Sequence, residues 1–274
     1  MPALKEYYRT KLGVLYKGDA MEGIKELDKK FKVIILDPPY VTLRDIRSRE
    51  WTIPEMRWIL RELYRLLENN GIIFYFGIPQ HFLEVSETIK NLYDVWFELI
   101  WVKPNAVNFG TARIKPLTRH ESIWCLIKKG TKKTEIGYNY RLVGEWGSKW
   151  LVKTRGKYDL FIDANKPYIQ SSNGFRFLTT VIEAENKPAM HPQERTEHPT
   201  QKPIKLIEKL VLGWSNEGDW ILDPFMGSGT TAVVAEKHRR KWVGIEIEEK
   251  WCELIKYRLE NAQYVRRLSD YVQK

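Results

Sequence analysis

Asp37, Pro38, Pro39 and Tyr40 directly follow a run of β-branched and apolar residues, 33–36, which is typical of a buried strand. The two prolines have no N–H and fix two φ angles, so the chain leaves the strand as a stiff segment that only accepts hydrogen bonds. A carboxylate, free carbonyls and an aromatic ring at the tip of a central strand suggest a ligand site. As a lone tetrapeptide the same residues are more often a plain turn.

A second group of chemically capable residues lies in 219–251, which reads strand, glycine-rich turn, helix and acid-tipped strand. Gly227 and Gly229 allow the backbone to turn tightly and to approach a ligand at the amino end of the helix. Asp223 at the first strand tip can accept from a ligand ammonium group. Glu246 stands where doubly wound nucleotide folds hold ribose hydroxyls, and the complete unit is a much stronger signal than a glycine pair.

The elements that position these residues alternate between strand and helix on both sides of an irregular middle segment. Such alternation predicts an α/β fold with a doubly wound, mostly parallel sheet. Residues 131–190 contain short strand-like pieces rich in Tyr, Trp and Lys without a long helix, so they read as a β-rich insertion. We therefore predict three parts, 1–130, the inserted 131–190, and 191–274. Segments 95–101 and 122–127 are expected to form an antiparallel pair, and 41–52 a polar loop.

Composition indicates one sizeable core with a smaller module in 274 residues. No apolar run reaches the roughly 18 to 20 residues that a membrane span needs, and residues 1–9 lack the apolar core of a secretory signal. Cys125 and Cys252 are far apart and outside any Cys-x-x-Cys pair, which predicts reduced thiols in a cytoplasmic protein. The histidines do not cluster with cysteines, so no metal site is expected.

The net charge of +10 is concentrated in the middle of the chain. Residues 101–182 hold 15 Lys and Arg against 5 Asp and Glu, and the rest of the chain holds 30 of each sign. A basic middle segment suggests a module that faces a polyanion. An ordinary lysine-rich solvated surface is an equally good interpretation of the charge alone.

Four motifs together resemble the beta class of S-adenosylmethionine-dependent DNA amino-methyltransferases. They are DPPY at 37–40, HPTQKP at 198–203, DPFMGSGTT at 223–231 and GIEIEEKW at 244–251, in the order of that class. These enzymes methylate adenine N6 or cytosine N4 and are mostly partners of restriction enzymes. The resemblance covers about 14–258 without the insertion. It implies a Rossmann-like methyltransferase sheet, S-adenosylmethionine as cofactor, and double-stranded DNA as substrate.

The resemblance assigns roles to individual residues of the cofactor motifs. Asp223 would bind the methionyl amino group of the cofactor, and Glu246 its ribose. The glycines at 227 and 229 would pass close to the cofactor, and Asp19 would lie near its adenine, although a helix cap is nearly as good a reading of Asp19. The remaining cofactor residues are Phe225 and, near the methionyl carboxylate, Thr200, Gln201 and Lys202. His198 is expected to be a loop-packing residue.

The resemblance also gives the first motif a chemical purpose. An exocyclic amine on an aromatic base is a poor nucleophile, because its lone pair is delocalised into the ring. The Asp37 carboxylate and the Pro38 carbonyl could bind both amine hydrogens and favour a pyramidal nitrogen, while Pro39 helps to keep the segment stiff and free of donors. Tyr40 would stack on a base swung out of the duplex. Positioning supplies most of what the reaction needs, with no metal or covalent intermediate.

The basic insertion 131–190 fits the target-recognition region of the resembled class. Its cations could neutralise DNA phosphates. The candidates are Lys132, Lys133, Lys149, Lys153, Arg155 and Lys157. Most of the aromatic rings interleaved with them, Tyr138 and Tyr140 among them, are expected to form the core of the small module.

We predict methylation of adenine N6 within a short duplex sequence. Cytosine N4 is the alternative, because its enzymes more often carry Ser in place of Asp37. An RNA substrate and a non-catalytic nucleic-acid binder with a methyltransferase fold stay open as well. The resemblance further suggests a cognate restriction endonuclease as a functional partner and a possible homodimer, with no membrane association.

Overall fold

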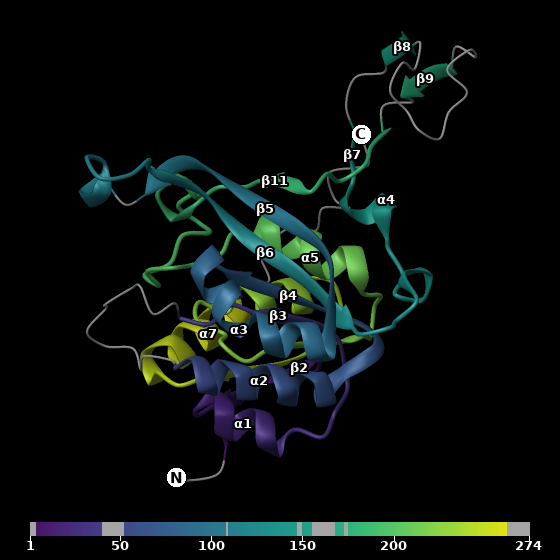
Figure 1. The fold of residues 1–274 in the computed structure, drawn as a ribbon. Helices are drawn as coiled ribbons and strands as arrows, with labels where there is room; N and C mark the ends of the chain where they lie inside the picture. The colour runs from purple at the N-terminus through teal and green to yellow at the C-terminus, as the bar shows by residue number, and fades with distance from the viewer. Residues whose placement is uncertain are drawn as a thin grey trace.

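A nine-stranded mixed sheet organises the computed structural model, which describes residues 4–39, 52–107, 109–146, 150–154, 168–172 and 175–261. The strand order is β1-β2-β13-β12-β3-β4-β6-β5-β11 (Figure 1). The strands are β1 Lys5–Arg9, β2 Gly13–Lys17, β3 Phe31–Leu36, β4 Leu67–Gly77, β5 Tyr93–Val107, β6 Thr118–Lys128, β11 Val181–Glu183, β12 Trp220–Asp223 and β13 Lys241–Glu246.

Five neighbouring strands, β2, β13, β12, β3 and β4, are parallel. Strand β6 runs antiparallel to both β4 and β5, and β11 lies parallel to β5 at the sheet edge. The other edge strand, β1, is antiparallel to β2. The predicted α/β class with a mostly parallel sheet is confirmed, as is the antiparallel pair of β5 and β6.

Helices cover both faces of this sheet, as expected for a doubly wound fold (Figure 1). Helices α1 (Ala20–Glu26), α2 (Ile53–Leu66) and α3 (Pro79–Leu92) bury their apolar residues in one core cluster. Helices α5 (Ile204–Trp214), α6 (Thr230–Lys237) and α7 (Glu249–Asn261) pack in the second cluster, on the opposite face. Because strand side chains alternate between faces, alternate residues of each central strand enter one cluster or the other.

Helix α2 begins at a capping box, in which Thr52 and Glu55 satisfy each other's backbone donors, and Pro54 stands in the first turn. The helix ends at Leu66, and β4 starts at once with Leu67. The pairing of β3 with β4 shifts register here, so the polar residues 68–70 form an irregular extension of the strand.

Strands β5 and β6 are longer than their apolar runs predict and form an arm that extends past the end of β4. The last residue of β4, Gly77, is opposite Ser122, so the part of the hairpin beyond Ser122 overhangs the carboxyl edge of the sheet. The apolar pattern ends at Trp101, whereas polar residues continue the backbone pairing. We call the described residues 103–107 and 109–120 the hairpin arm; the 3₁₀ helix η1 (Phe109–Thr111) lies near its tip.

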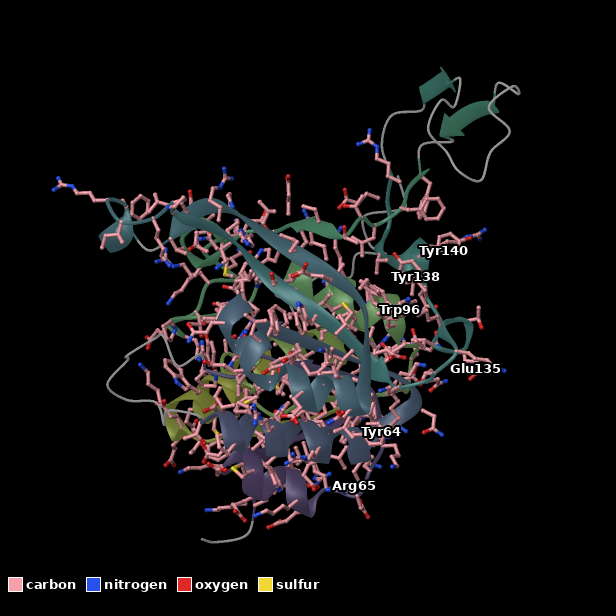
Figure 2. All side chains as sticks on the ribbon, in the orientation of Figure 1. Tyr64, Arg65, Trp96, Glu135, Tyr138 and Tyr140 are labelled. Atoms are coloured by element: carbon pink, nitrogen blue, oxygen red, sulfur yellow. The ribbon has the colours of Figure 1, made fainter. Side chains whose placement is uncertain are left out.

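The predicted boundaries of the insertion, 131–190, enclose residues that belong to the main body. Strand β11 is hydrogen-bonded to β5 in the central sheet. Tyr138 stacks on Trp214 of α5 with ring centroids 4.8 Å apart, and Figure 2 labels Tyr138 on the right of the view, as it does Trp96. Helix α4 (Tyr140–Val143) contributes a buried Val143. Apolar contacts with α5 therefore continue the core beyond residue 131.

The rest of the insertion has the β-rich character that the sequence predicts. Strands β7 (Glu145–Trp146) and β10 (Phe175–Arg176) form one antiparallel pair, and β8 (Trp150–Thr154) and β9 (Tyr168–Ser172) form another (Figure 1). Tyr140 contacts Phe175 and Phe177 in a small aromatic cluster, as expected for the module's own core. Two short 3₁₀ helices, η2 (Lys133–Glu135) and η3 (Lys187–Ala189), lie on either side of this region.

Both cysteines are buried free thiols. None of the helices in the described ranges is long and apolar enough to cross a bilayer. Within those ranges, His, Cys, Asp and Glu side chains do not gather in groups of three that could hold a metal ion.

Candidate active site

Three acids from distant parts of the chain meet at the carboxyl edge of the sheet. Asp223 ends β12, Glu246 ends β13, and Asp37 directly follows β3. Strand β12 lies between β3 and β13 in the parallel ladder, so the three strand tips are adjacent. This is the edge at which ligands bind in open α/β sheets.

Asp223 is a buried acid, with 4% of its surface exposed. Its Oδ2 accepts from the Thr231 hydroxyl at 2.6 Å, and its Oδ1 accepts from the backbone N–H of Phe225 at 3.0 Å. Burial raises the pKa of Asp223 to about 7, and these two hydrogen bonds only partly oppose the shift; the nearby charge of Asp37 adds to it. Asp223 therefore favours a cationic partner at this position.

Glu246 is the second buried acid and also braces the glycine turn. Its Oε2 accepts from the N–H of Gly227 at 2.8 Å, and its Oε1 accepts from the N–H of Glu248 at 2.9 Å. Burial raises the pKa of Glu246 to about 7 in spite of these bonds. The sequence predicts a ribose contact for this residue but gives no indication of the brace.

The two glycines of the turn are required by their backbone conformation. Gly227 has φ 52° and Gly229 has φ 78°, in the left-handed region that favours glycine. A Cβ at Gly227 would lie 3.1 Å from the His198 ring, and one at Gly229 would lie 2.7 Å from a methylene carbon of Ile255. The turn thus brings bare backbone to the start of α6, as a cofactor-binding turn requires.

The loop 198–203 packs against this turn, as the resemblance implies. The Thr230 hydroxyl donates to the Lys202 carbonyl at 3.0 Å. Gln201 is buried, and its amide accepts from Thr196 N at 2.7 Å and donates to Glu194 O at 2.8 Å, so it shapes the loop. The predicted direct contact of Gln201 with the cofactor has to compete with these bonds.

The other loop residues take different positions. Thr200 is exposed. The ring of His198 packs against Trp251 with centroids 4.6 Å apart, in the packing role that the sequence predicts. Burial lowers the pKa of His198 to about 4, which keeps it neutral at physiological pH.

Asp19 caps α1, because its carboxylate accepts from Met21 N at 2.9 Å. The capping alternative is confirmed, and a contact with the adenine of the cofactor stays a prediction. Asp19 follows β2, whose last residue pairs with Glu246, so it stands at the same edge of the sheet. Phe225 lies half-buried between Asp223 and the glycine turn.

These residues fit S-adenosylmethionine. The buried acids Asp223 and Glu246, with pKa values of about 7, can accept hydrogen bonds from an ammonium group and from hydroxyls. The turn between them contains Gly227 and Gly229, which present backbone without side chains. Asp223 and the loop 198–203 would hold the methionyl part, and Glu246 the ribose. The donor set of the cofactor matches this set of acceptors.

The motif with a predicted catalytic role, residues 37–40, begins on the neighbouring strand tip. Asp37 is partly buried, with 19% of its side chain exposed, Pro38 is buried and Pro39 is exposed. Tyr40, predicted to stack on the target base, lies outside the described residues. The Asp37 carboxylate contacts the Lys202 ammonium group in a short ion pair.

Lys202 thus contacts Asp37, the predicted catalytic acid, and its predicted place near the methionyl carboxylate stays a prediction. A second acid, Glu121 of β6, lies with its Oε2 3.8 Å from the Lys202 ammonium, and its Oε1 pairs with Lys103 of β5. Sequence reasoning missed Glu121 and Lys103. Strand alternation could have identified Glu121, because it places this acid on the same face as the buried Ile123 and Cys125.

Two of the six predicted DNA-binding cations, Lys132 and Lys133, lie at the edge of the sheet opposite Asp37. Lys132 and Lys133 follow the end of β6, which is antiparallel to β4, so they stand near the start of β4. The neighbouring Thr131 hydroxyl contacts Asn69 O at 3.2 Å there. Figure 2 shows Glu135 of the same segment on the right of the view, whereas strands β5 and β6 extend to the upper left in Figure 1. The predicted DNA contact of both lysines stays a prediction.

The other four cations cannot be placed against the site. Lys149, Arg155 and Lys157 lie outside the described residues, and only the backbone of Lys153, in β8, is described. Their role as phosphate contacts stays a prediction.

The hairpin arm carries exposed cations at the carboxyl edge of the sheet, the edge at which Asp37 lies. Arg113, Lys115 and Arg119 are exposed, and Phe109 and Ile114 on the same arm are 69% and 84% exposed. Part of the positive surplus that the sequence analysis found in 101–182 is therefore located here. Basic side chains beside exposed apolar ones suit a surface that meets nucleic acid.

The fold and the site define a methyltransferase of the S-adenosylmethionine-dependent class. The model of the DNA methylase family for N6 and N4 enzymes matches residues 31–257, and the chain belongs to this family. It is similar to type II methyltransferase M.HinfI from Haemophilus influenzae, with 28% identity over 95% of this chain and 72% of that protein. DNA adenine methyltransferase YhdJ from Escherichia coli (strain K12) is 25% identical over 90% of this chain and 82% of that protein.

Solved structures agree with this assignment. The crystal structure of the M1.HpyAVI–SAM complex has a TM-score of 0.59 and 25% identity, covering 90% of this chain and 100% of that one. The PvuII DNA methyltransferase, described as cytosine-N4-specific, has a TM-score of 0.66 with 17% identity over 93% and 89% of the two chains, and so supports the fold alone.

Proposed function

We propose that the chain transfers a methyl group from S-adenosylmethionine to the exocyclic N6 of an adenine within a short duplex DNA sequence. The observation that carries this proposal is the adjacency of Asp37 and Asp223 at the tips of β3 and β12. A cofactor whose amino group pairs with Asp223 would have its methionyl chain next to the Asp37 segment.

Bound S-adenosylmethionine supplies a sulfonium methyl group that is already activated for transfer. The Asp37 carboxylate and the Pro38 carbonyl accept the two hydrogens of the target amine and favour a pyramidal, nucleophilic nitrogen. Because Pro38 and Pro39 have no N–H, no backbone donor at these two positions competes with the amine. Burial of the surrounding strand tips strengthens these hydrogen bonds by excluding water.

The target adenine must leave the duplex to reach Asp37, because the amine inside a base pair is already hydrogen-bonded. Tyr40 is the proposed stacking partner of the extrahelical base. Aromatic stacking of this kind is worth about 1 to 3 kcal/mol per base. The overhanging hairpin arm and the carboxyl edge of the sheet together form the proposed docking face for the duplex.

Adenine is preferred over cytosine for two reasons. Asp37 is a charged acceptor, and a charged acceptor polarises the amine more strongly than the serine hydroxyl more often found in cytosine-N4 enzymes. The similarity to a protein named DNA adenine methyltransferase, over 90% of this chain, points the same way.

The test is methylation of plasmid DNA from a methylation-deficient host, followed by digestion to nucleosides and mass analysis. N6-methyladenosine should appear with wild-type protein and be absent with Asp37→Ala. N4-methylcytidine as the sole product would overturn the choice of base. Label transfer to RNA in place of DNA would overturn the substrate class.

Several finer assignments belong to the same proposal. Sequence recognition is assigned to the module within 131–190, with Lys153, Arg155 and Lys157 among its phosphate contacts. A cognate restriction endonuclease, a homodimer and a cytoplasmic location are supported by the family resemblance and by similarity to type II methyltransferases. Light scattering of the purified protein checks the dimer, and sequencing of modified bases in expressing cells checks the recognition site.

A further inference from the structure

Four charged side chains form a row at the carboxyl edge, on one face of the sheet: Asp37, Lys202, Glu121 and Lys103. Lys202 contacts Asp37, and Lys103 contacts Glu121, each in a short ion pair. The Lys202 ammonium lies 5.1 Å from the centroid of the buried Phe76 ring. Two cations and two anions sum to zero charge, which suits a partly buried row of ions on an apolar floor.

One atom of this row lacks a hydrogen bond. Glu121 Oε2 is buried and has no hydrogen-bond partner among the described residues. The ammonium of Lys202 lies 3.8 Å from this oxygen, beyond hydrogen-bond range. A buried carboxylate oxygen left unpaired is costly, and such groups in a native structure call for an explanation.

The position of Lys202 suggests that explanation. Its ammonium donates to Asp37 Oδ2, and donation to Asp37 is also the task proposed for the target amine. The two donors compete for the same carboxylate. A cation kept against Asp37 during methyl transfer would also oppose the positive charge that develops on the attacking nitrogen.

We infer that Lys202 is a placeholder for the target amine, and that its ammonium moves from Asp37 to the unpaired oxygen of Glu121 when the base docks. The inference rests on the proposed role of Asp37. A shift of Nζ by about 1 Å brings it within the roughly 2.8 Å of a charge-assisted hydrogen bond to Glu121. No proton is transferred in this step, and the Asp37 oxygen that Lys202 leaves can accept from the amine.

Lys103 gives Glu121 a fixed orientation. It holds Oε1, so that Oε2 stays directed toward Lys202. Burial raises the pKa of Glu121, and the ammonium groups of Lys202 and Lys103 outweigh this effect and bring the pKa below its usual value. Glu121 is therefore an anion ready to receive Lys202. Glu121 and Lys202 act as positioning residues through Asp37.

The test measures single-turnover methylation of unmethylated plasmid DNA together with the dissociation constants for DNA and for S-adenosylhomocysteine. Glu121→Gln should slow the single-turnover rate by about tenfold to a hundredfold, the effect of one charge-assisted hydrogen bond, with both dissociation constants within about twofold of wild type. Glu208→Gln is the matched control. Glu208 is a buried acid of α5 paired with Lys237 at 2.8 Å, away from the site, and its loss should leave the rate unchanged.

The conservative variant Lys202→Arg distinguishes a placeholder role of Lys202 from a purely structural ion pair with Asp37. The guanidinium of Lys202→Arg can hold two carboxylates at once, so it would keep Asp37 occupied and the rate low while the fold is retained. A purely structural pair predicts normal activity for Lys202→Arg. Wild-type rates in either Glu121→Gln or Lys202→Arg would overturn the inference.

The Asp37→Ala variant distinguishes failure of the inference about Lys202 from failure of the proposed function of Asp37. If Asp37→Ala is inactive while Glu121→Gln is fully active, only the placeholder fails. If Asp37→Ala is active, the proposed function of Asp37 fails, and the inference falls with it.

Discussion

The raised pKa values of Asp223 and Glu246 predict that cofactor binding weakens steeply in mildly acidic solution. Burial raises both pKa values to about 7 in the unliganded protein. In the proposed complex, ionised carboxylates bind the ammonium and ribose groups of the cofactor more strongly than protonated carboxyls would. Binding must then expel a proton from each acid that is still protonated, and the affinity falls as pH falls through 7.

The size of the effect follows from the fraction ionised. A carboxyl with a pKa of about 7 is about 9% ionised at pH 6 and about 76% ionised at pH 7.5. The dissociation constant should therefore rise about eightfold between these pH values for one acid, and about seventyfold for both. His198, with its pKa lowered by burial to about 4, does not titrate in this window.

Isothermal titration calorimetry with S-adenosylhomocysteine measures this dependence without turnover. Asp223→Asn should bind more weakly and keep only the roughly eightfold dependence that comes from Glu246. Dissociation constants for the wild type that agree within about twofold at both pH values would refute the reasoning. In that case the acids are already ionised before the cofactor arrives, or do not contact it.

The same shifts act in the opposite direction on the stability of the unliganded protein. An acid with a raised folded-state pKa binds its proton more tightly when folded than when unfolded. Its contribution to stability is present below the ordinary pKa of about 4 and is lost as pH rises through 7. The increase in melting temperature caused by the cofactor should therefore grow from pH 6 to pH 7.5.

Three further predictions concern the arm, the turn and a helix cap. Replacing Arg113 and Lys115 by Ala should flatten the slope of log DNA affinity against log salt by about two units. The control, Lys132→Ala with Lys133→Ala, should leave the slope unchanged. Equal slopes for the two double variants would contradict the placement of the DNA at the carboxyl edge. Gly229→Ala should lower the free energy of unfolding in urea by about 2 kcal/mol or more, because φ is 78° and Ile255 is 2.7 Å from the new Cβ. Gly130→Ala, with φ 79° and open space around it, is the control for the backbone effect alone, and an equal cost in the two variants would remove the packing contribution. Thr52→Ala should cost about 1 kcal/mol by breaking the capping box of α2, and Thr52→Ser should not; a Thr52→Ala protein with an unchanged urea midpoint would contradict this.

The parts of the fold that the sequence predicts are those with a local signal. Apolar runs at 33–36 and 221–222 mark central strands, and the glycines at 227 and 229 mark a left-handed turn. The acids at the strand tips could be located because a parallel sheet collects its carboxyl ends at one edge. Local sequence patterns are sufficient to locate a strand when its own residues are apolar because the strand is buried.

The parts that the sequence missed depend on neighbours far along the chain. The hairpin arm is built by backbone pairing of polar residues such as His120, which no apolar pattern reveals. The position of Lys132 and Lys133 follows from the antiparallel direction of β6, and charge counting carries no information on direction. Glu121 was overlooked for the same reason, because its partner Lys202 belongs to a loop after the insertion.

The seam between β3 and β12 has a consequence for how the protein folds. These strands lead to Asp37, the proposed catalytic acid, and Asp223, the proposed cofactor acid, and their register consists of two residue pairs, Val33 with Ile221 and Ile34 with Leu222. One partner is synthesised early and the other near the end of the chain, so the contact closes a very long loop and forms slowly. During refolding, helix formation should therefore precede recovery of cofactor binding. A nascent chain that stops before β12 lacks Asp223 and Glu246, so we expect it neither to bind the cofactor nor to methylate DNA.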